Sequence, residues 1–184
     1  GSAVQSGNAF AAELYGQLGK EEGNLFFSPH SVHVALAMTW AGARGATAAL
    51  ENDLLHLPVP SPEPDDVRTA LRRWYERQAR TVFAERLDTL RARAPWATHR
   101  ELTLKLRRMR KTWGTCSHEG VIRLNTHLVK APGDCLDYVV AHELCHLEVM
   151  NHGPDFYALQ DRLWPEWRAT RAWLREHGHR YTQE

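Results

Sequence analysis

The segment His142-Glu143-Leu144-Cys145-His146 constrains this chain more than any other feature, because it places two histidines four residues apart. On an α-helix, residues at that spacing share one face, so both imidazoles can bind a single ion. Glu143 lies beside the first histidine and can reach a metal-bound water without taking a coordination position. Two histidines, a third ligand and an open position are typical of a catalytic zinc site. The sequence therefore predicts one Zn²⁺ per chain.

The environment of this segment argues against a chance match. The preceding residues 136–141 are apolar enough to bury a helix, and this would place the charged segment inside the fold. A buried Glu between two histidines is costly unless a metal ion or hydrogen bonds compensate for the lost hydration. We therefore interpret His142 and His146 as metal ligands and Glu143 as the general base.

His152 is the predicted third ligand. If the helix continued past His146, His152 would lie roughly 240° further around it, at ~100° per residue, and could not meet the same ion. The helix must therefore end between the two histidines. Asn151 and Gly153 tolerate turn conformations and Pro154 cannot continue a helix, so a turn here can return His152 to the metal.

Other assignments of the third ligand remain open at this stage. The spacing to His152 equals that of the metzincin pattern, but Val149 stands where that pattern has a turn-forming Gly, so the sequence does not assign that clan. Carboxylates could replace His152 as a ligand, and the candidates are Glu148, Glu166 and Glu176.

Length and composition set broad limits. With 184 residues, 43% of them hydrophobic, the chain can form one ordinary domain or two very small ones. No apolar run approaches the ~18 residues of a membrane span, so no membrane association is expected. The three cysteines are an odd number without a C-x-x-C pair, which predicts a reducing, cytoplasmic setting.

The charges are unevenly distributed although the net charge is only +1. Residues 67–111 carry fourteen Lys and Arg against four Asp and Glu, whereas residues 1–66 carry two against eight. A basic segment of this kind can bind nucleic acid or acidic partners. We favour the simpler interpretation, in which it forms a solvated helix face whose arginines pair with the acidic front of the chain.

Periodicity and turn signals predict the order of the elements. Helices are expected at residues 8–19, 29–43, 47–57, 66–94, 133–150, 156–164 and 166–177. Strands are expected at residues 24–28, 102–106, 111–117 and 121–125. Four prolines between residues 58 and 64 predict a stiff linker and a domain boundary.

The second part of the chain resembles the YgjP-like zinc metallopeptidases, which are related to the SprT-like group. The resemblance covers about residues 70–178 and includes Trp113-Gly114-Thr115-Cys116-Ser117, the segment Asp137-Tyr138-Val139-Val140-Ala141 with the histidine motif after it, and Asn151-His152-Gly153-Pro154. The family usually has Ser in place of Thr115 and Gly153 and Trp in place of Tyr157. The resemblance implies a minimal zincin fold, in which the active-site helix lies behind an edge strand.

The front of the chain resembles the first helices of a serpin over about residues 8–58, including Asn24-Leu25-Phe26-Phe27-Ser28-Pro29 and Leu55-His56-Leu57-Pro58. A serpin inhibits by inserting a reactive loop into a large sheet, and this chain has neither, so that mechanism is not available to it. A fragment of a larger fold exposes apolar faces unless something covers them. We expect the fragment to pack on the peptidase part or on a second copy of the chain.

Together these patterns predict an α+β fold with three segments. A small, mostly helical serpin-like fragment (1–58) and a Pro-rich linker (59–66) precede a zincin-like metallopeptidase domain (67–184) with helices on a small twisted sheet. The expected activity is zinc-dependent hydrolysis of a peptide or unfolded protein. The edge-strand residues Trp113, Gly114, Thr115 and Cys116, together with Tyr157, are candidates for substrate binding, and His118, Tyr138 and Tyr157 for oxyanion stabilisation.

Two alternative functions remain open from the sequence. One is a latent or non-catalytic zinc-bearing interaction module, in which the serpin-like segment is a pro-segment or a docking element. The other is a DNA-associated protease of the SprT type, suggested by the basic residues 67–111 but less favoured.

Overall fold

The computed structural model describes residues 35–39, 49–51, 54–59 and 63–182. The chain divides into two compact units, residues 1–76 and 77–184. The helix predicted at residues 8–19 and the strand predicted at residues 24–28 lie outside the described residues. The predicted division into fragment, linker and peptidase domain stays a prediction.

The first unit contains a three-stranded sheet where we predicted helices. Strands β1 (Ala35–Thr39) and β3 (Leu54–Pro58) are parallel, and β2 (Ala49–Glu51) pairs with β3 in the antiparallel direction. The prediction of helices through Ala43 and from Thr47 to Leu57 is therefore wrong in the described residues. Alanine and leucine favour helices locally, but pairing between segments distant in sequence decides the conformation here.

The burial pattern explains why β3 is extended. Leu55, Leu57 and Val59 are all buried, at the two-residue spacing of side chains on one face of a strand. They form a hydrophobic cluster with Val67 and Trp74 from the first part of α2 (Pro64–Arg91). Burial of one face against this helix stabilises the small sheet.

The second unit contains another three-stranded sheet, in the order β4-β6-β5. Strands β4 (Thr103–Arg107) and β6 (Val121–Asn125) are parallel, whereas β5 (Gly114–Cys116) pairs antiparallel to β6 and forms an edge of the sheet. All three strands lie within or close to the predicted segments. Gly120, with a φ of 80°, makes the turn between β5 and β6, where a residue with a side chain would be strained.

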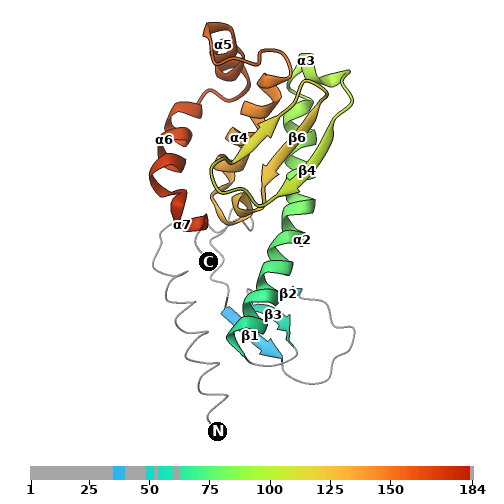
Figure 1. Ribbon diagram of the computed structural model, residues 1–184, viewed down its shortest axis with the longest axis vertical. Helices are drawn as coiled ribbons and strands as arrows, with labels where there is room; N and C mark the ends of the chain where they lie inside the picture. Colours follow the sequence, from blue (N-terminus) through green and yellow to red (C-terminus); the bar gives the residue numbers. More distant parts are fainter. Residues whose placement is uncertain (1–34, 40–48, 52–53, 60–62, 183–184) are drawn as a thin grey trace. The chain divides into compact units, whose positions relative to one another are not determined.

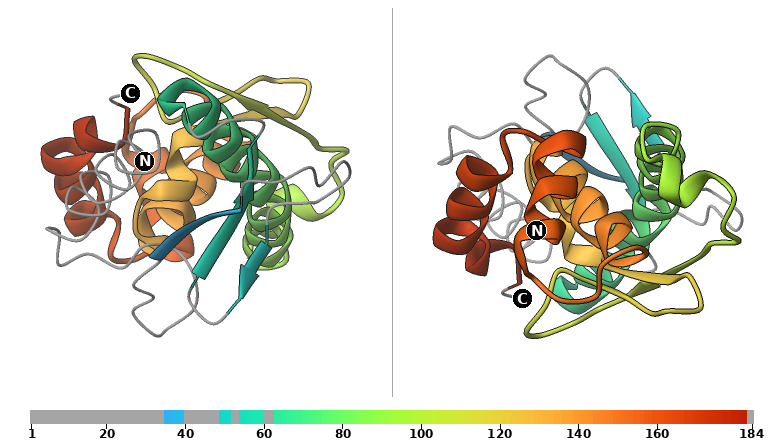
Figure 2. Two further views of the ribbon diagram at one scale, coloured as in Figure 1. Left: turned by 90° about the horizontal axis from the view of Figure 1, so that it is seen from below. Right: turned by 90° about the horizontal axis from the view of Figure 1, so that it is seen from above.

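Helix α4 (Gly133–His146) is the centre of this unit. It contacts β5 on one side and the helices α5 (Pro154–Leu163) and α6 (Trp167–His177) elsewhere on its surface (Figure 1). The second part of α2 and helix α6 lie on opposite sides of α4 (Figure 2). The short elements that complete the unit are α3 (Pro95–Thr98), the 3-10 helix η1 (Thr126–Lys130) and α7 (His179–Thr182).

Nearly every residue of α4 from Cys135 to Cys145 is buried, which confirms the prediction of a buried helix. Two of these buried residues, Asp137 and Glu143, are acidic. Arg86 on α2 faces Asp137, with 3.4 Å between guanidinium nitrogen and carboxylate oxygen. Glu143 has no such counter-ion among the described residues.

Helix α4 ends at His146, so the predicted end between His146 and His152 is confirmed, although it comes before the predicted Met150. The Asn151 side chain accepts a hydrogen bond from the Gly153 amide at 3.1 Å, which closes a local turn. Pro154 then begins α5 in the first turn of the helix, where the backbone amide has no hydrogen-bond partner within the helix, so a proline is tolerated.

Among the described helices, none is long and apolar enough to cross a membrane.

Candidate metal centre

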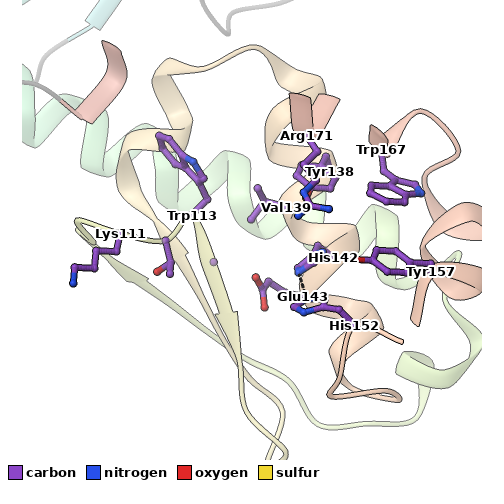
Figure 3. A pocket seen from close by; sticks show the side chains of 12 residues that line it. Lys111, Trp113, Tyr138, Val139, His142, Glu143, His152, Tyr157, Trp167 and Arg171 are labelled. Carbon is purple, nitrogen blue, oxygen red and sulfur yellow. Dashed lines mark hydrogen bonds between the residues drawn. The ribbon is translucent and has the colours of Figure 1, made fainter. Parts of the chain in front are cut away.

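The structure brings His142, His146 and His152 together. One ring nitrogen of each lies within 4.8 Å of the others, and the Nε2 atoms of His142 and His152 are 3.0 Å apart (Figure 3). In the part of the chain that the structure describes, Glu148, Glu166 and Glu176 do not belong to this group. Glu148 instead lies 3.8 Å from Arg100. These three histidines could therefore hold a metal ion.

The second ring nitrogens set the tautomers of the two helical histidines. His142 Nδ1 lies 3.1 Å from the side-chain oxygen of Gln160, and His146 Nδ1 lies 3.1 Å from the carbonyl oxygen of Val149. Because both oxygens only accept, each Nδ1 carries the proton and each Nε2 has a free lone pair. Hydrogen bonds of this kind orient metal-binding histidines in proteins.

The donor set fits zinc. Zn–N bonds of about 2.1 Å in tetrahedral geometry place two ligand nitrogens about 3.4 Å apart, close to the observed separation of the His142 and His152 Nε2 atoms. Burial, together with the neighbouring His146 and His152, lowers the pKa of His142 to about 4, and burial also lowers the pKa of His146. Both imidazoles are therefore neutral at pH 7, which is the form that binds metals.

Phe156 supports all three histidines. Its ring centroid lies 4.8, 4.6 and 4.7 Å from those of His142, His146 and His152, and its side chain is completely buried. Phe156 belongs to α5, so the turn after α4 positions both His152 and the apolar residue against which the cluster packs. The sequence analysis did not identify this role.

Glu143 is buried beside the histidines without a partner for one of its oxygens. Its side chain is 4% exposed, and Oε2 makes no hydrogen bond to a described residue. Burial raises the pKa of this carboxyl to about 8. A cation bound by the adjacent imidazoles would favour the charged form and compensate for the lost hydration. The orphaned oxygen therefore also fits a metal ion at this position.

The edge strand β5 approaches Glu143 closely at Gly114. A Cβ atom at Gly114 would lie 2.6 Å from Oε1 of Glu143 and 2.9 Å from its Cγ. Only a glycine leaves enough space for the Glu143 side chain in its present position. This close approach explains why residue 114 is a glycine, which the sequence alone did not reveal.

A pocket of about 410 Å³ opens beside the metal centre. Of the predicted substrate-binding residues, Trp113, Gly114 and Tyr157 line it, whereas Thr115 and Cys116 lie on β5 but not among the lining residues. Tyr138 also lines the pocket, and the exposed His118 does not. The lining residues that sequence analysis missed are Lys111, Thr112, Val139, Trp167 and Arg171. Two of them, Trp167 and Arg171, are four residues apart on α6, a spacing that could have indicated a shared face.

Comparison with protein families gives one match that covers most of the chain. The model of the YgjP-like metallopeptidase domain matches residues 22–177. Two solved structures are similar over about half of the chain. The metallopeptidase zymogen abylysin of Pyrococcus abyssi is 19% identical, with a TM-score of 0.45 over 53% of this chain and 93% of that one. The zymogen jannalysin of Methanocaldococcus jannaschii is 18% identical, with a TM-score of 0.44 over 51% and 94%.

Curated relatives match a shorter part of the chain. An uncharacterised serpin-like protein of Thermococcus kodakarensis is 46% identical over 65 residues, which is 35% of this chain. Human Serpin B8 is 44% identical over 55 residues, or 29% of this chain. The chain spans only 14% and 15% of the length of these two relatives, so the likeness to serpins concerns a short segment.

Proposed function

This chain belongs to the YgjP-like metallopeptidase family, and from this membership and the geometry of the site we propose that it is a zinc-dependent endopeptidase in which Glu143 is the general base. The observation that carries the proposal is the convergence of three imidazoles beside a buried carboxyl group with an orphaned oxygen. The proposed ligands are His142, His146 and His152, with one zinc ion per chain.

A zinc ion at this position would acidify the attacking water and polarise the scissile carbonyl group. The carboxylate of Glu143 accepts the proton of that water and then donates it to the leaving amine as the C–N bond breaks. Burial of Glu143 assists the first step, because a raised pKa makes the carboxylate a stronger base. The hydroxyl groups of Tyr138 and Tyr157 in the pocket are the candidate donors to the oxyanion.

The edge strand β5 is the proposed guide for an extended substrate. Among the described strands it has a neighbour on one side only, in the order β4-β6-β5, and Gly114 at its start lies close to Glu143. An added peptide strand would pair with the main chain of Gly114–Cys116 and pass beside the general base.

The proposal is tested by metal content and casein hydrolysis of the purified protein. We expect one zinc ion per chain and hydrolysis that stops when a chelator removes the ion and returns when zinc is added. A folded protein that binds no zinc would overturn the proposal. Bound zinc without hydrolysis of casein would support the non-catalytic or latent alternative instead.

The partners and the location of the protein remain predictions. We propose a peptide or an unfolded protein as substrate, and we expect the serpin-like segment to pack on the peptidase part or on a second copy of the chain. Binding of DNA by the basic residues 67–111 and a cytoplasmic location also stay untested.

Gln160 provides a test of the metal centre that does not depend on catalysis. Replacing Gln160 by Leu removes the acceptor for His142 Nδ1, so the ring can rotate, and we expect about tenfold weaker zinc binding. The fold should tolerate the change, because Gln160 is completely buried and its Nε2 has no partner among the described residues. Competition with a chromophoric chelator measures the affinity.

The matched control is Gln160→Glu, which keeps an acceptor at the same position and should retain the affinity of the wild type. Equal zinc affinity in the Leu variant and the wild type would show that Gln160 does not orient the His142 ring. A Leu variant that melts at the wild-type temperature excludes a general loss of structure as the cause of weaker binding.

A further inference from the structure

The charged groups that line the pocket are unbalanced. Apart from histidines, they are Lys111, Arg171 and Glu143. Glu143 is assigned to proton transfer, so the groups left to contact the substrate are both cations. The Lys111 side chain points away from the histidines, whereas Arg171 lies close to Tyr138 beside His142 (Figure 3). Of these two cations, Arg171 is therefore the one that faces the histidines.

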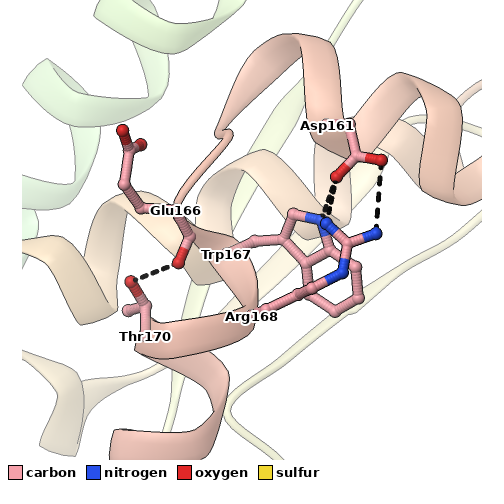
Figure 4. Close-up of polar contacts among 5 residues, drawn as sticks. All are labelled: Asp161, Glu166, Trp167, Arg168 and Thr170. Carbon is pink, nitrogen blue, oxygen red and sulfur yellow. Dashed lines mark hydrogen bonds and ion pairs between the residues drawn. The ribbon is translucent and has the colours of Figure 1, made fainter.

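Among the described residues, Arg171 has no counter-ion like the one that its neighbour Arg168 has on α6. Arg168 pairs with Asp161 through both of its terminal nitrogens, the second at 3.3 Å (Figure 4). Arg171 is exposed and makes no ion pair with any described residue. No described residue accepts a hydrogen bond from its guanidinium group, and such a group matches a carboxylate in a bidentate arrangement.

A rigid aromatic wall lies beside Arg171. The Trp167 ring stacks on Tyr157, with 5.1 Å between centroids and an angle of 11°. Its Nε1 donates to Asp161 at 2.7 Å, which fixes the orientation of the ring (Figure 4). The Arg171 guanidinium carbon lies 6.0 Å from the Trp167 ring centroid. The Arg168 guanidinium also lies over the Trp167 ring, 4.4 Å from its centroid, so an acidic side chain would pack its methylene groups on the edge of the wall while its carboxylate meets Arg171.

Arg171 lies beside the reacting groups. It lines the same pocket as His142 and Glu143, and its side chain lies close to Tyr138 (Figure 3). Tyr138 in turn packs beside His142, with 5.9 Å between the ring centroids. A substrate group bound to Arg171 would therefore lie close to the scissile bond.

We propose that Arg171 and the adjoining aromatic wall of Trp167 and Tyr157 form a subsite for a carboxylate of the peptide substrate, next to the bond that is cleaved. This inference rests on the proposed peptidase function and adds a substrate class to it. The proposed carboxylate is that of a Glu or Asp side chain. The C-terminus of a peptide would make the same bidentate contact, but cleavage beside it would make the protein a carboxypeptidase instead of an endopeptidase.

Hydrolysis of matched peptides tests the subsite. One series carries Glu, Gln or Lys in turn at each position that flanks the scissile bond, and a second series compares free and amidated C-termini. We expect kcat/KM for the best Glu or free-acid peptide to exceed that of its neutral counterpart about tenfold, and the ratio to fall at high salt. A ratio near one at every position and terminus would overturn the proposal.

Three variants assign the effect to Arg171. Arg171→Met should remove the preference for the carboxylate, and Arg171→Glu should turn it into a preference for Lys. Arg175→Met is the matched control, because Arg175 is an exposed residue of the same helix that does not line the pocket, and it should keep the tenfold ratio. A preference that survives in the Arg171→Met variant would also overturn the proposal.

Binding separates this proposal from the peptidase function. The zinc-loaded Glu143→Gln variant is titrated into labelled Glu and Gln peptides, and fluorescence anisotropy should show about tenfold tighter binding of the Glu peptide. Preferential binding without hydrolysis by the wild type would support the subsite and contradict the peptidase function. If the wild type hydrolyses peptides but the Glu and Gln peptides bind equally and have equal kcat/KM, the peptidase function is supported and the subsite is contradicted.

Discussion

Replacing Glu143 by Gln is expected to lower kcat for peptide hydrolysis by roughly 10³-fold while the zinc content stays at one ion per chain. Glutamine has almost the same shape but cannot accept the proton of the attacking water. The variant should fold, because Glu143 is buried with an orphaned oxygen, and a neutral amide costs less to bury than a carboxylate. Single-turnover kinetics measure the rate of hydrolysis, metal analysis measures the zinc content, and thermal melting measures the stability of the fold.

The control for this substitution is Asp134→Asn, which makes the same change from acid to amide at an exposed position of α4. It should leave kcat unaltered, because Asp134 does not line the pocket. A Glu143→Gln variant that retains more than about a tenth of the wild-type kcat would show that another group accepts the proton, since general base catalysis contributes 10²–10⁴-fold. Loss of zinc from the variant would instead make Glu143 part of the binding site.

The core of the metal centre could be predicted because its signals are local. The four-residue spacing places His142 and His146 on one helix face, and the turn residues Asn151 and Pro154 require the helix to end before His152. These rules concern neighbours in sequence, and the structure confirms both the turn and the convergence of the three rings. The role of His142, His146 and His152 as zinc ligands stays a proposal.

The supporting residues could not be predicted because their contacts join distant segments. Gln160 meets His142 across eighteen residues, and Gly114 approaches Glu143 from a different element altogether. Neither residue type signals such a role by itself, since a buried glutamine and a glycine in a strand have many uses. Only the packing of α5 and β5 on α4 gives them their place in the site.

The strands near the front of the chain show how local propensity can mislead. Residues 47–57 contain several good helix formers, which led to the prediction of a helix. The alternation of Leu55 and Leu57, continued by Val59, was the competing signal, and the buried face of β3 follows it. Pairing of β3 with β1 and β2 supplies hydrogen bonds that a reading of one segment cannot anticipate.

Gly114→Ala is expected to lower kcat about 100-fold although residue 114 takes no part in the chemistry. The new Cβ would lie 2.6 Å from Oε1 of Glu143 and 2.9 Å from Cγ1 of Val139. Pairing with Leu124 and the hydrogen bond from the Asn125 amide to the Trp113 carbonyl, at 2.8 Å, hold the strand in place. The Glu143 side chain must therefore move, and a displacement of about 1 Å can cost 10²-fold in rate.

The same substitution at Gly120 distinguishes this effect from general destabilisation. Gly120 makes the turn after β5 with a φ of 80°, and a Cβ there would lie 2.4 Å from the Glu101 carbonyl oxygen. Gly120→Ala should therefore lower stability by about 1–2 kcal/mol or more but leave kcat of the folded protein unchanged. If both variants lose activity only in proportion to unfolding, Gly114 has no specific role beside Glu143.

A double variant shows whether Gly114 acts through Glu143. If the only effect of the added methyl group is to displace the base, Gly114→Ala should slow the wild type about 100-fold but should not slow Glu143→Gln any further. Two losses that multiply would mean that β5 contributes separately, for example through its main-chain pairing with the substrate. Zinc affinity should stay the same in all variants of this cycle, because the three atoms nearest to a Cβ at Gly114 belong to Glu143 and Val139 and not to a histidine.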